Sequence, residues 1–204
     1  MSQSAFWLIL LCTAAYGVLH SALAAERVKA FIQQRVSTRA YSSYRLAYNL
    51  VAGVTLLPLA ALVLLLPDRT VYRIPAPWVF LTLALQAAAL LCLFLAFRQS
   101  HPGEFLGVQQ VGLTPRQSEN TTLMTAGFYR LCRHPLYFFG LLLIWLFPIM
   151  TWNLLALFLG FTLYILIGSR LEERRLVHEY GEEYRAYMRT TPWLIPNPLQ
   201  LLRK

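Results

Sequence analysis

Charge is scarce in this chain of 204 residues: only 13% of the residues are charged, against about a quarter in a typical soluble domain. Hydrophobic residues make up 57% of the chain. Long stretches contain no Lys, Arg, Asp or Glu at all, namely residues 5–24, 46–66, 78–97 and 135–169. This composition excludes an ordinary soluble domain and indicates a protein that is built into a membrane.

Cysteine and histidine are also few, with three and four residues respectively. Cys12 and Cys92 lie in uncharged stretches and Cys132 lies in a polar loop, so no disulfide framework is indicated. The spacing of these residues does not match a metal site, and we expect no resident metal.

Residues 1–25 contain no Lys or Arg, whereas a cleaved signal sequence begins with a basic region. We therefore interpret the first uncharged stretch as a retained span. The first three stretches each have about the 20 residues that a helix needs to cross a ~30 Å hydrocarbon core. The stretch 135–169 is interrupted at Pro148, which predicts a hairpin of two helices, 136–150 and 154–169. The expected fold class is an all-α integral membrane bundle of about five transmembrane helices.

The basic residues predict the orientation of these spans. With five spans and an external N-terminus, 16 of the 18 Lys and Arg residues fall on the inner side, and only Arg69 and Arg73 fall outside. We expect a cytoplasmic C-terminus and a multi-pass protein of the bacterial inner membrane. The net charge of +9 then reflects topology and contact with anionic membrane lipids rather than nucleic-acid binding.

The chain divides into a three-span region, residues 1–97, and a polar C-terminal region, residues 98–204. The second region contains a long polar connection, the predicted hairpin and a helix expected over residues 170–190. Apolar and charged residues alternate at helical spacing in that helix, which predicts that it is amphipathic and lies at the cytoplasmic side. Prolines after residue 191 end any helix.

Two polar features flank the predicted hairpin. Arg133 and His134 precede Pro135, which suits the first turn of a helix, and a helix N-terminus favours an anion. Glu172 and Glu173 follow the last apolar segment, and adjacent helical residues point about 100° apart. One glutamate is therefore expected to face the bundle. Together the two features suggest a zwitterionic, amino-acid-like ligand.

Each feature also has a plainer interpretation. Arg133 could be a topology anchor and His134 an interfacial helix cap. The two glutamates could form surface ion pairs with Arg174 or Arg175, which would contribute under ~1 kcal/mol each.

A resemblance favours the functional interpretation. Residues 127–140, GFYRLCRHPLYFFG, resemble the signature G-x-Y-R-x-x-R-H-P-x-Y-x-x-G of the isoprenylcysteine carboxyl methyltransferases and their relatives, which include phospholipid methyltransferases. The likeness continues to Glu172 and Glu173. It then extends through residues 176–196, which are similar to the closing pattern F/Y-G-x-E-Y-x-x-Y and a terminal proline. These three ordered motifs span 70 residues, which makes the resemblance specific.

The N-terminal half carries weaker motifs. The segments 16–24 (YGVLHSALA), 44–49 (YRLAYN) and 104–107 (EFLG) are similar to NnrU-type membrane proteins and to bacterial methanethiol S-methyltransferases of the same broad superfamily.

The resemblance implies a methyltransferase that binds S-adenosyl-L-methionine at the cytoplasmic end of the hairpin, under the C-terminal tail. The implied cofactor-binding residues are Tyr129, Arg133, His134, Tyr137, Gly140, Glu172, Glu173, Tyr184 and Tyr187. Among them, the arginine and histidine would hold the carboxylate end, the glutamates would meet amino or ribose groups, and Gly140 would permit close helix approach. The acceptor would be lipophilic, such as a prenylated cysteine, or small and membrane-permeable, such as methanethiol.

A base is needed only for a neutral thiol or amine acceptor, and the candidates are His20, His101 and Glu104. His20 lies in a span, where an ionisable residue marks a functional site by default. Its plainer interpretation is a helix-end histidine bonded to a carbonyl. Two other functions stay open: a non-catalytic NnrU-like protein of nitrogen-oxide or redox metabolism, and haem or quinone binding through His20, His101 and His134. No pair of these histidines lies one or two turns apart on one helix, which disfavours the last.

Overall fold

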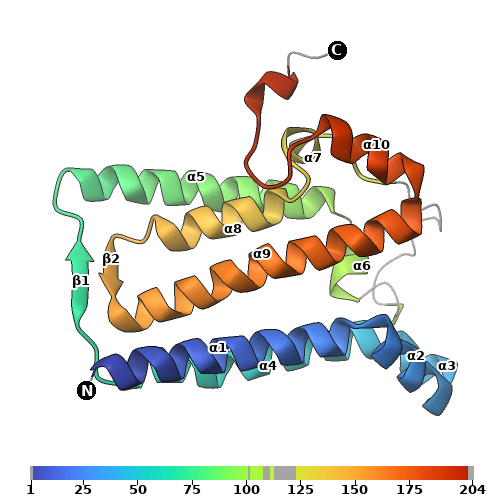
Figure 1. Ribbon diagram of the computed structural model, residues 1–204, viewed down its shortest axis with the longest axis horizontal. Coiled ribbons are helices and arrows are strands. Elements are labelled where there is room, and N and C mark those ends of the chain that lie inside the picture. The colour runs from blue at the N-terminus through green and yellow to red at the C-terminus, as the bar shows by residue number, and fades with distance from the viewer. Residues whose placement is uncertain (1, 101, 108–110, 113–122, 202–204) are drawn as a thin grey trace. The chain divides into compact units, whose positions relative to one another are not determined.

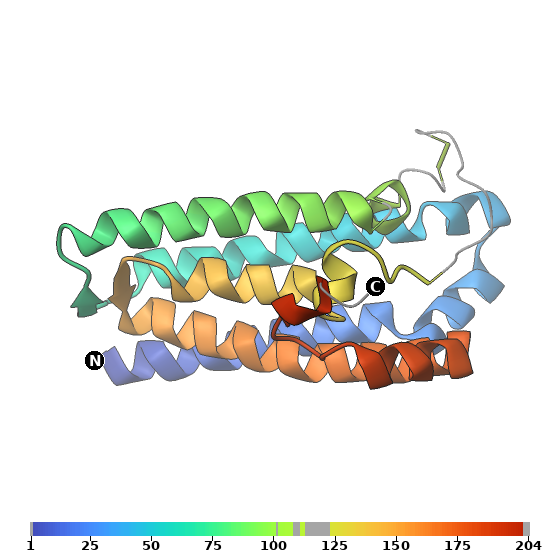
Figure 2. The ribbon, with the colours of Figure 1, turned by 90° about the horizontal axis from the view of Figure 1, so that it is seen from above.

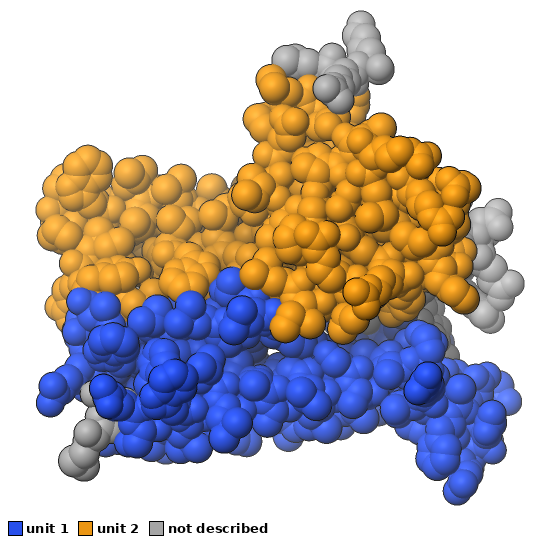
Figure 3. All heavy atoms as spheres, viewed as in Figure 1, with its two compact units in different colours: residues 1–71, 101–119, 151–164 blue, residues 72–100, 120–150, 165–204 orange. Residues whose placement is uncertain are grey.

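Figure 1 shows a computed structural model of the chain, which describes residues 2–100, 102–107, 111–112 and 123–201. The chain forms two compact units, each made of segments that are distant in the sequence (Figure 3). Unit 1 contains residues 1–71, 101–119 and 151–164. Unit 2 contains residues 72–100, 120–150 and 165–204. The compact units therefore do not follow the division at residue 97, which stays a prediction about functional regions.

The described residues are mostly helical, which confirms the all-α class. Among them, four helices are long and apolar enough to cross a membrane: α1 (Ser2–Ala24), α4 (Tyr44–Leu65), α5 (Trp78–Gln99) and α9 (Trp152–Tyr180). The fifth apolar helix, α8 (Pro135–Trp145), has 11 residues. Its length is about 16 Å, roughly half of a hydrocarbon core. Five complete spans are therefore not confirmed.

The predicted helices 154–169 and 170–190 are wrong in their boundaries. α9 continues without a break for 29 residues, from the apolar segment into the charged one. The break falls at Gly181, whose φ of 58° is in the region that favours glycine. The shorter helix α10 (Glu182–Thr190) follows it.

Unit 1 is a bundle of α1, α4 and the first part of α9. Its core consists of Ile9, Leu59, Val63 and Ala156. α1 and α9 approach closely, because a Cβ on Gly160 would lie 2.6 Å from the side chain of Thr13. The smaller helices of this unit are α2 (Glu26–Arg35), α3 (Thr38–Ser42) and α6 (Pro102–Leu106).

A network of hydrogen bonds joins the end of α4 to the start of α9 in unit 1. The Asn153 side chain, which is fully buried, donates to the carbonyls of Val63 and Leu66 at 3.3 and 3.2 Å. In return, the Asp68 carboxylate accepts from the Asn153 backbone N–H at 3.1 Å. These bonds satisfy helix-end groups that would otherwise be unpaired in a membrane.

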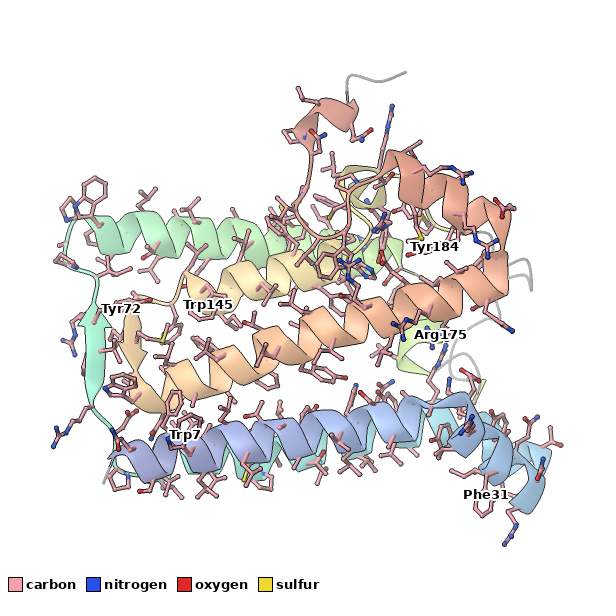
Figure 4. All side chains as sticks on the ribbon, in the orientation of Figure 1. Trp7, Phe31, Tyr72, Trp145, Arg175 and Tyr184 are labelled. Carbon is pink, nitrogen blue, oxygen red and sulfur yellow. The ribbon has the colours of Figure 1, made fainter. Side chains whose placement is uncertain are left out.

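Unit 2 is built on α5 and α8, which pack side by side (Figures 1 and 2). The Gln86 side chain donates to the Leu143 carbonyl at 2.8 Å, which pairs the middle of one helix with the later part of the other. At the end of the unit where α8 begins, α7 (Phe128–Leu131), α10, the 3₁₀ helix η1 (Pro198–Leu201) and the last part of α9 gather. Tyr72 and Trp145 lie toward the opposite end (Figure 4). Partly exposed aromatic residues of this kind are typical of a membrane–water interface.

The strands β1 (Thr70–Arg73) and β2 (Ile149–Thr151) pair in a two-stranded sheet. Two of the five points at which the chain passes from one unit to the other fall within these strands. All candidate cofactor-binding residues lie in unit 2, in the part formed by α7, α8, α9, α10 and the C-terminal tail, by which we mean residues 191–201.

Candidate functional site

The site begins at a glycine turn before α7. Gly127 has a φ of 61°, and a Cβ there would lie 2.5 Å from the side-chain amide of Gln99. Because no side chain fills this space, Gln99 Oε1 accepts a hydrogen bond from the Phe128 N–H at 3.1 Å. The first glycine of the signature thus ties the start of α7 to the end of α5.

Arg133 connects α9 to the end of α10 and to the segment that follows it. Its Nε donates to Glu173 Oε1 at 2.7 Å, and the two side chains are only 8% and 5% exposed. Its Nη1 donates to the carbonyls of Met188 and Thr191 at 2.9 and 3.0 Å. Its backbone N–H donates to the Pro192 carbonyl at 2.9 Å. Nε, Nη1 and the backbone N–H are therefore used within the protein, and the role of Arg133 in holding a ligand carboxylate stays a prediction.

Both glutamates face the signature motif. Glu173 is buried, and in addition to Arg133 it has Arg170 at 3.5 Å. Glu172 is 33% exposed in its side chain and accepts a hydrogen bond from the Tyr137 hydroxyl at 2.8 Å. The expectation that only one glutamate turns toward the bundle is therefore wrong, because the motif is wide enough to reach both.

The surface interpretation of the glutamates is also wrong. Arg174 and Arg175 are exposed on α9, and neither is the partner of the buried carboxylate. The pairing comes from Arg133, 40 positions earlier in the chain and two residues before α8.

His134 is the N-cap residue of α8 and is 6% exposed. Its ring stacks on Tyr137 with 5.3 Å between the ring centroids. Nδ1 lies 3.8 Å from Glu172 and Nε2 lies 3.5 Å from Glu173, which are too long for good hydrogen bonds. Nε2 has no hydrogen-bond partner among the described residues. Burial lowers the pKa of His134 from its usual range, although the two glutamates oppose this shift.

The tyrosines of α10 close the site from another side. Tyr187 donates to the Tyr129 carbonyl at 2.5 Å. Tyr184 is buried between α10 and the last part of α9 (Figure 4), and its hydroxyl has no hydrogen-bond partner in the part of the chain that is described. Burial raises the pKa of both hydroxyls far above the ordinary value, and it raises the pKa of Tyr129 to about 12. None of the three tyrosines is therefore a base near neutral pH.

Sequence reasoning missed Trp193 and Arg170. The Arg170 guanidinium lies 3.6 Å from the centroid of the Trp193 ring, which is a cation–π contact. The Trp193 carbonyl accepts from the His134 backbone N–H at 3.2 Å, while its indole Nε1 is buried without a partner in the described structure. The sequence feature that could have indicated Trp193 is its position between Pro192 and Pro196 in the closing segment.

The remaining predicted residues lie elsewhere. A Cβ on Gly140 would meet no atom of the described structure within 4 Å, so its expected role in close helix approach is wrong. His20 lies on α1 in unit 1. His101 and the Glu104 side chain lie outside the described residues.

Seven residues of unit 2 thus form what we call the signature cluster: Arg133, His134, Tyr137, Glu172, Glu173, Tyr184 and Trp193. A buried ion pair lies at its centre, and three of its polar atoms are buried without partners among the described residues. An unsatisfied buried polar group costs about 1–3 kcal/mol. A polar organic ligand would remove that cost.

Comparison with known proteins identifies the family. Residues 78–191, more than half of the chain, match the family described as Protein of unknown function (DUF1295). The chain belongs to the DUF1295 family. The DUF1295 match contains the signature cluster except Trp193. It also confirms, together with the relatives below, the predicted membership of the isoprenylcysteine carboxyl methyltransferase-like proteins. The likeness to NnrU-type proteins stays a prediction.

Several relatives of this DUF1295 protein are named methanethiol S-methyltransferases. Methanethiol S-methyltransferase 1 of Bradyrhizobium diazoefficiens is 31% identical over 190 residues, which cover 92% of this chain and 65% of the relative. The enzymes of Crocosphaera subtropica and Pseudomonas deceptionensis are 42% and 38% identical over 95 and 96 residues, or 46% of this chain and 37% of each relative. The chain spans less than two thirds of the length of these relatives. No solved structure matches it.

Proposed function

We propose that the chain is an integral membrane methyltransferase that uses S-adenosylmethionine and methylates a small or lipophilic acceptor, with a thiol as the favoured class. The signature cluster supports the cofactor, and the names of the relatives support the thiol. The observation that carries the proposal is the set of three buried polar atoms without partners in the described structure: His134 Nε2, Tyr184 Oη and Trp193 Nε1.

These atoms match an amino-acid-like ligand. The indole and phenol can donate to a carboxylate, and the partly exposed Glu172 carboxylate can accept from an ammonium group. The cofactor, when bound, supplies a methyl group on a positively charged sulfur. The protein then has to bind, orient and exclude water, which is the work of positioned side chains.

Arg133 has a positioning role in this scheme. Its hydrogen bonds fix the Glu173 carboxylate and the tail around the ligand groups of His134 and Trp193. The geometry of the cluster thus depends on Arg133, whose Nε and Nη1 donors bond to groups of the protein itself.

We further propose that the cluster lies at the cytoplasmic end of the spans in a bacterial inner membrane, as the distribution of basic residues predicts. The alternative, a non-catalytic NnrU-like protein, is disfavoured because a scaffold gains nothing from unsatisfied buried polar atoms. Haem or quinone binding through the histidines has no support beyond their presence. An absorbance spectrum of the purified protein would test it.

Calorimetric titration of S-adenosylmethionine, in detergent and in lipid nanodiscs, tests the proposal. Tyr184→Phe should weaken binding about tenfold, the value of a hydrogen bond of ~1.4 kcal/mol. It should leave stability unchanged or slightly raised, because the hydroxyl has no partner within the described structure. His134→Ala should weaken binding by about ten- to a hundredfold.

The matched control is His178→Ala, which changes an exposed histidine of α9. Wild-type affinity in both cluster variants, or no binding by folded wild-type protein, would remove the proposed cofactor site. A transfer assay with labelled cofactor and methanethiol tests the acceptor class separately.

A further inference from the structure

Three N-terminal motifs that the signature cluster does not use come together in unit 1. They are the segments 16–24 on α1, 44–49 at the start of α4, and 104–107 at α6. Asn49 Nδ2 donates to the Leu106 carbonyl at 3.1 Å. Gly107 has a φ of 85°, and a Cβ there would lie 2.6 Å from the backbone nitrogen of Leu46. Only a glycine permits this approach, so Gly107 allows segment 104–107 to pack against segment 44–49.

His20 lies where the first two of these motifs meet. Its Nε2 is 2.5 Å from the Tyr48 hydroxyl. Its ring stacks on Tyr16 with 5.7 Å between centroids, and the edge contact with Tyr164 of α9 has a centroid distance of 5.8 Å. A Cβ on Gly17 would lie 2.8 Å from the Tyr164 ring, so glycine at this position makes room for that ring. Three aromatic rings thus fix the imidazole.

One polar atom of this arrangement, His20 Nδ1, is buried and has no hydrogen-bond partner in the described structure. The two neighbouring hydroxyls are directed elsewhere, since Tyr48 meets Nε2 and Tyr16 lies 3.4 Å from the Ala52 carbonyl. The plainer interpretation of His20, a helix-end histidine bonded to a backbone carbonyl, does not account for an unpaired nitrogen inside a span. When Nε2 carries the ring proton, Nδ1 has a free lone pair and can accept a proton.

We propose that the His20 cluster, consisting of Tyr16, His20, Tyr48 and Tyr164, binds a small alkyl thiol and accepts its proton; this inference rests on the methyltransferase function proposed above. A thiol has one weakly polar S–H group and an apolar body, which matches one ring nitrogen among aromatic rings. A carboxylate or phosphate would need several donors to be desolvated here. A groove of about 270 Å³ also borders Tyr16 and is otherwise lined largely by apolar side chains, among them Leu19, Pro58 and Leu59.

The proton step is simple. The S–H bond breaks, its electron pair stays on sulfur, and the proton moves to Nδ1, which gives a thiolate and an imidazolium. In methyl transfer the thiolate sulfur bonds to the methyl carbon of S-adenosylmethionine while the bond from that carbon to the donor sulfur breaks, which gives the methylated thioether and S-adenosylhomocysteine. The imidazolium then releases its proton to water, so each turnover releases one proton.

Binding is tested without any methyl donor. Saturation-transfer NMR measures the affinity of ¹³C-labelled methanethiol for the full chain in lipid nanodiscs, for the wild type, His20→Gln and the exposed-histidine control His178→Gln. The glutamine at position 20 keeps a hydrogen bond toward Tyr48 but has no basic nitrogen at the place of Nδ1. We expect His20→Gln to bind methanethiol about tenfold more weakly, from loss of a hydrogen bond. Binding of dimethyl sulfide, which has no S–H group, should not change. Equal methanethiol affinity in all three proteins would overturn the proposal.

If His20→Gln does not fold, as judged by gel filtration, Tyr48→Phe takes its place. This variant removes the hydroxyl that orients the imidazole, so thiol binding should again weaken, and unchanged binding would overturn the proposal. Should the wild type bind the thiol but transfer no methyl group, the proposed function fails while the thiol site stands.

Turnover provides the second readout. At pH 7, His20→Gln should methylate methanethiol at least ~100-fold more slowly than the wild type, the usual effect of losing a general base. Its affinity for S-adenosylmethionine should be unchanged. The deficit should shrink about tenfold per pH unit up to the pKa of methanethiol, which lies above the value of about 8.5 of a cysteine side chain, because the thiol then ionises by itself. A purely structural role would lower the rate equally at every pH, and that result would contradict the proton step.

Discussion

Glu173→Gln should destabilise unit 2 by about 3–5 kcal/mol, which is the cost of leaving one member of a buried ion pair without its partner. The Arg133 guanidinium and the Glu173 carboxylate are 2.7 Å apart, and their side chains are 8% and 5% exposed. Water therefore cannot replace the lost charge. Glutamine keeps the size of the side chain and one oxygen acceptor, so the experiment isolates the loss of the charge.

A matched control is available on α10. Glu182 and Arg185 form an ion pair at 2.6 Å, but their side chains are 74% and 51% exposed. Glu182→Gln should cost only about 0–1 kcal/mol, because solvent screens an exposed pair. Glu172→Gln should cost about 1 kcal/mol, since its bond to Tyr137 is partly exposed. Burial rather than distance is then the factor that decides the ranking.

Unfolding in mixed micelles titrated with SDS measures these differences, and limited proteolysis of the tail adds a local readout. Loss of the Glu173 charge leaves Arg133 less firmly placed, and Arg133 also holds the carbonyls of Met188 and Thr191. Cleavage within the tail should therefore become faster. A Glu173→Gln variant as stable as Glu182→Gln, with unchanged tail cleavage, would refute the reasoning.

Three further changes test local features. Burial raises the pKa of the Cys132 thiol to about 11, so N-ethylmaleimide at pH 8 should leave Cys132 unlabelled until the protein unfolds, as mass spectrometry of its peptide would show. Burial lowers the pKa of His134 in the folded protein. As the pH decreases below the unfolded value of about 6.5, the unfolded chain therefore binds more protons than the folded one, and stability should decrease. His134→Gln should reduce this loss of stability in thermal unfolding between pH 7 and 5. Gly127→Ala combines a positive φ with a clash against Gln99 and should lower stability by about 1–3 kcal/mol, whereas Gly53→Ala, which meets nothing within 4 Å, should not.

Composition alone predicted α1, α4 and α5, because an uncharged, apolar run of about 20 residues is typical of a membrane-spanning helix. The signature motif predicted that Arg133, His134 and Tyr137 lie together, and the geometry brings them to the two glutamates of α9. Both successes depend on information that is local in the sequence.

The failures depend on distant partners. The apolar run 135–169 does not show where its helices end, because α9 begins where Asp68, 85 positions earlier, accepts a hydrogen bond from the Asn153 N–H. The partners of Arg133 could not be predicted for a related reason. Two of its partners are backbone carbonyls, and every residue has a carbonyl, so no residue type in the sequence marks them.

The attachment of the tail has a consequence for how this protein can vary. Four carbonyl oxygens, that of Met188 at the end of α10 and those of Thr191, Pro192 and Trp193 in the tail, accept hydrogen bonds from Arg133 and the His134 backbone. A substitution in the tail changes a side chain but leaves its carbonyl in place. Substitutions in the tail at positions other than Trp193 should therefore cost little as long as the backbone keeps its path, whereas a single change at Arg133 removes the bonds to two of those carbonyls at once. Random mutagenesis should accordingly find that most tail positions other than Trp193 accept substitutions, whereas Arg133 does not.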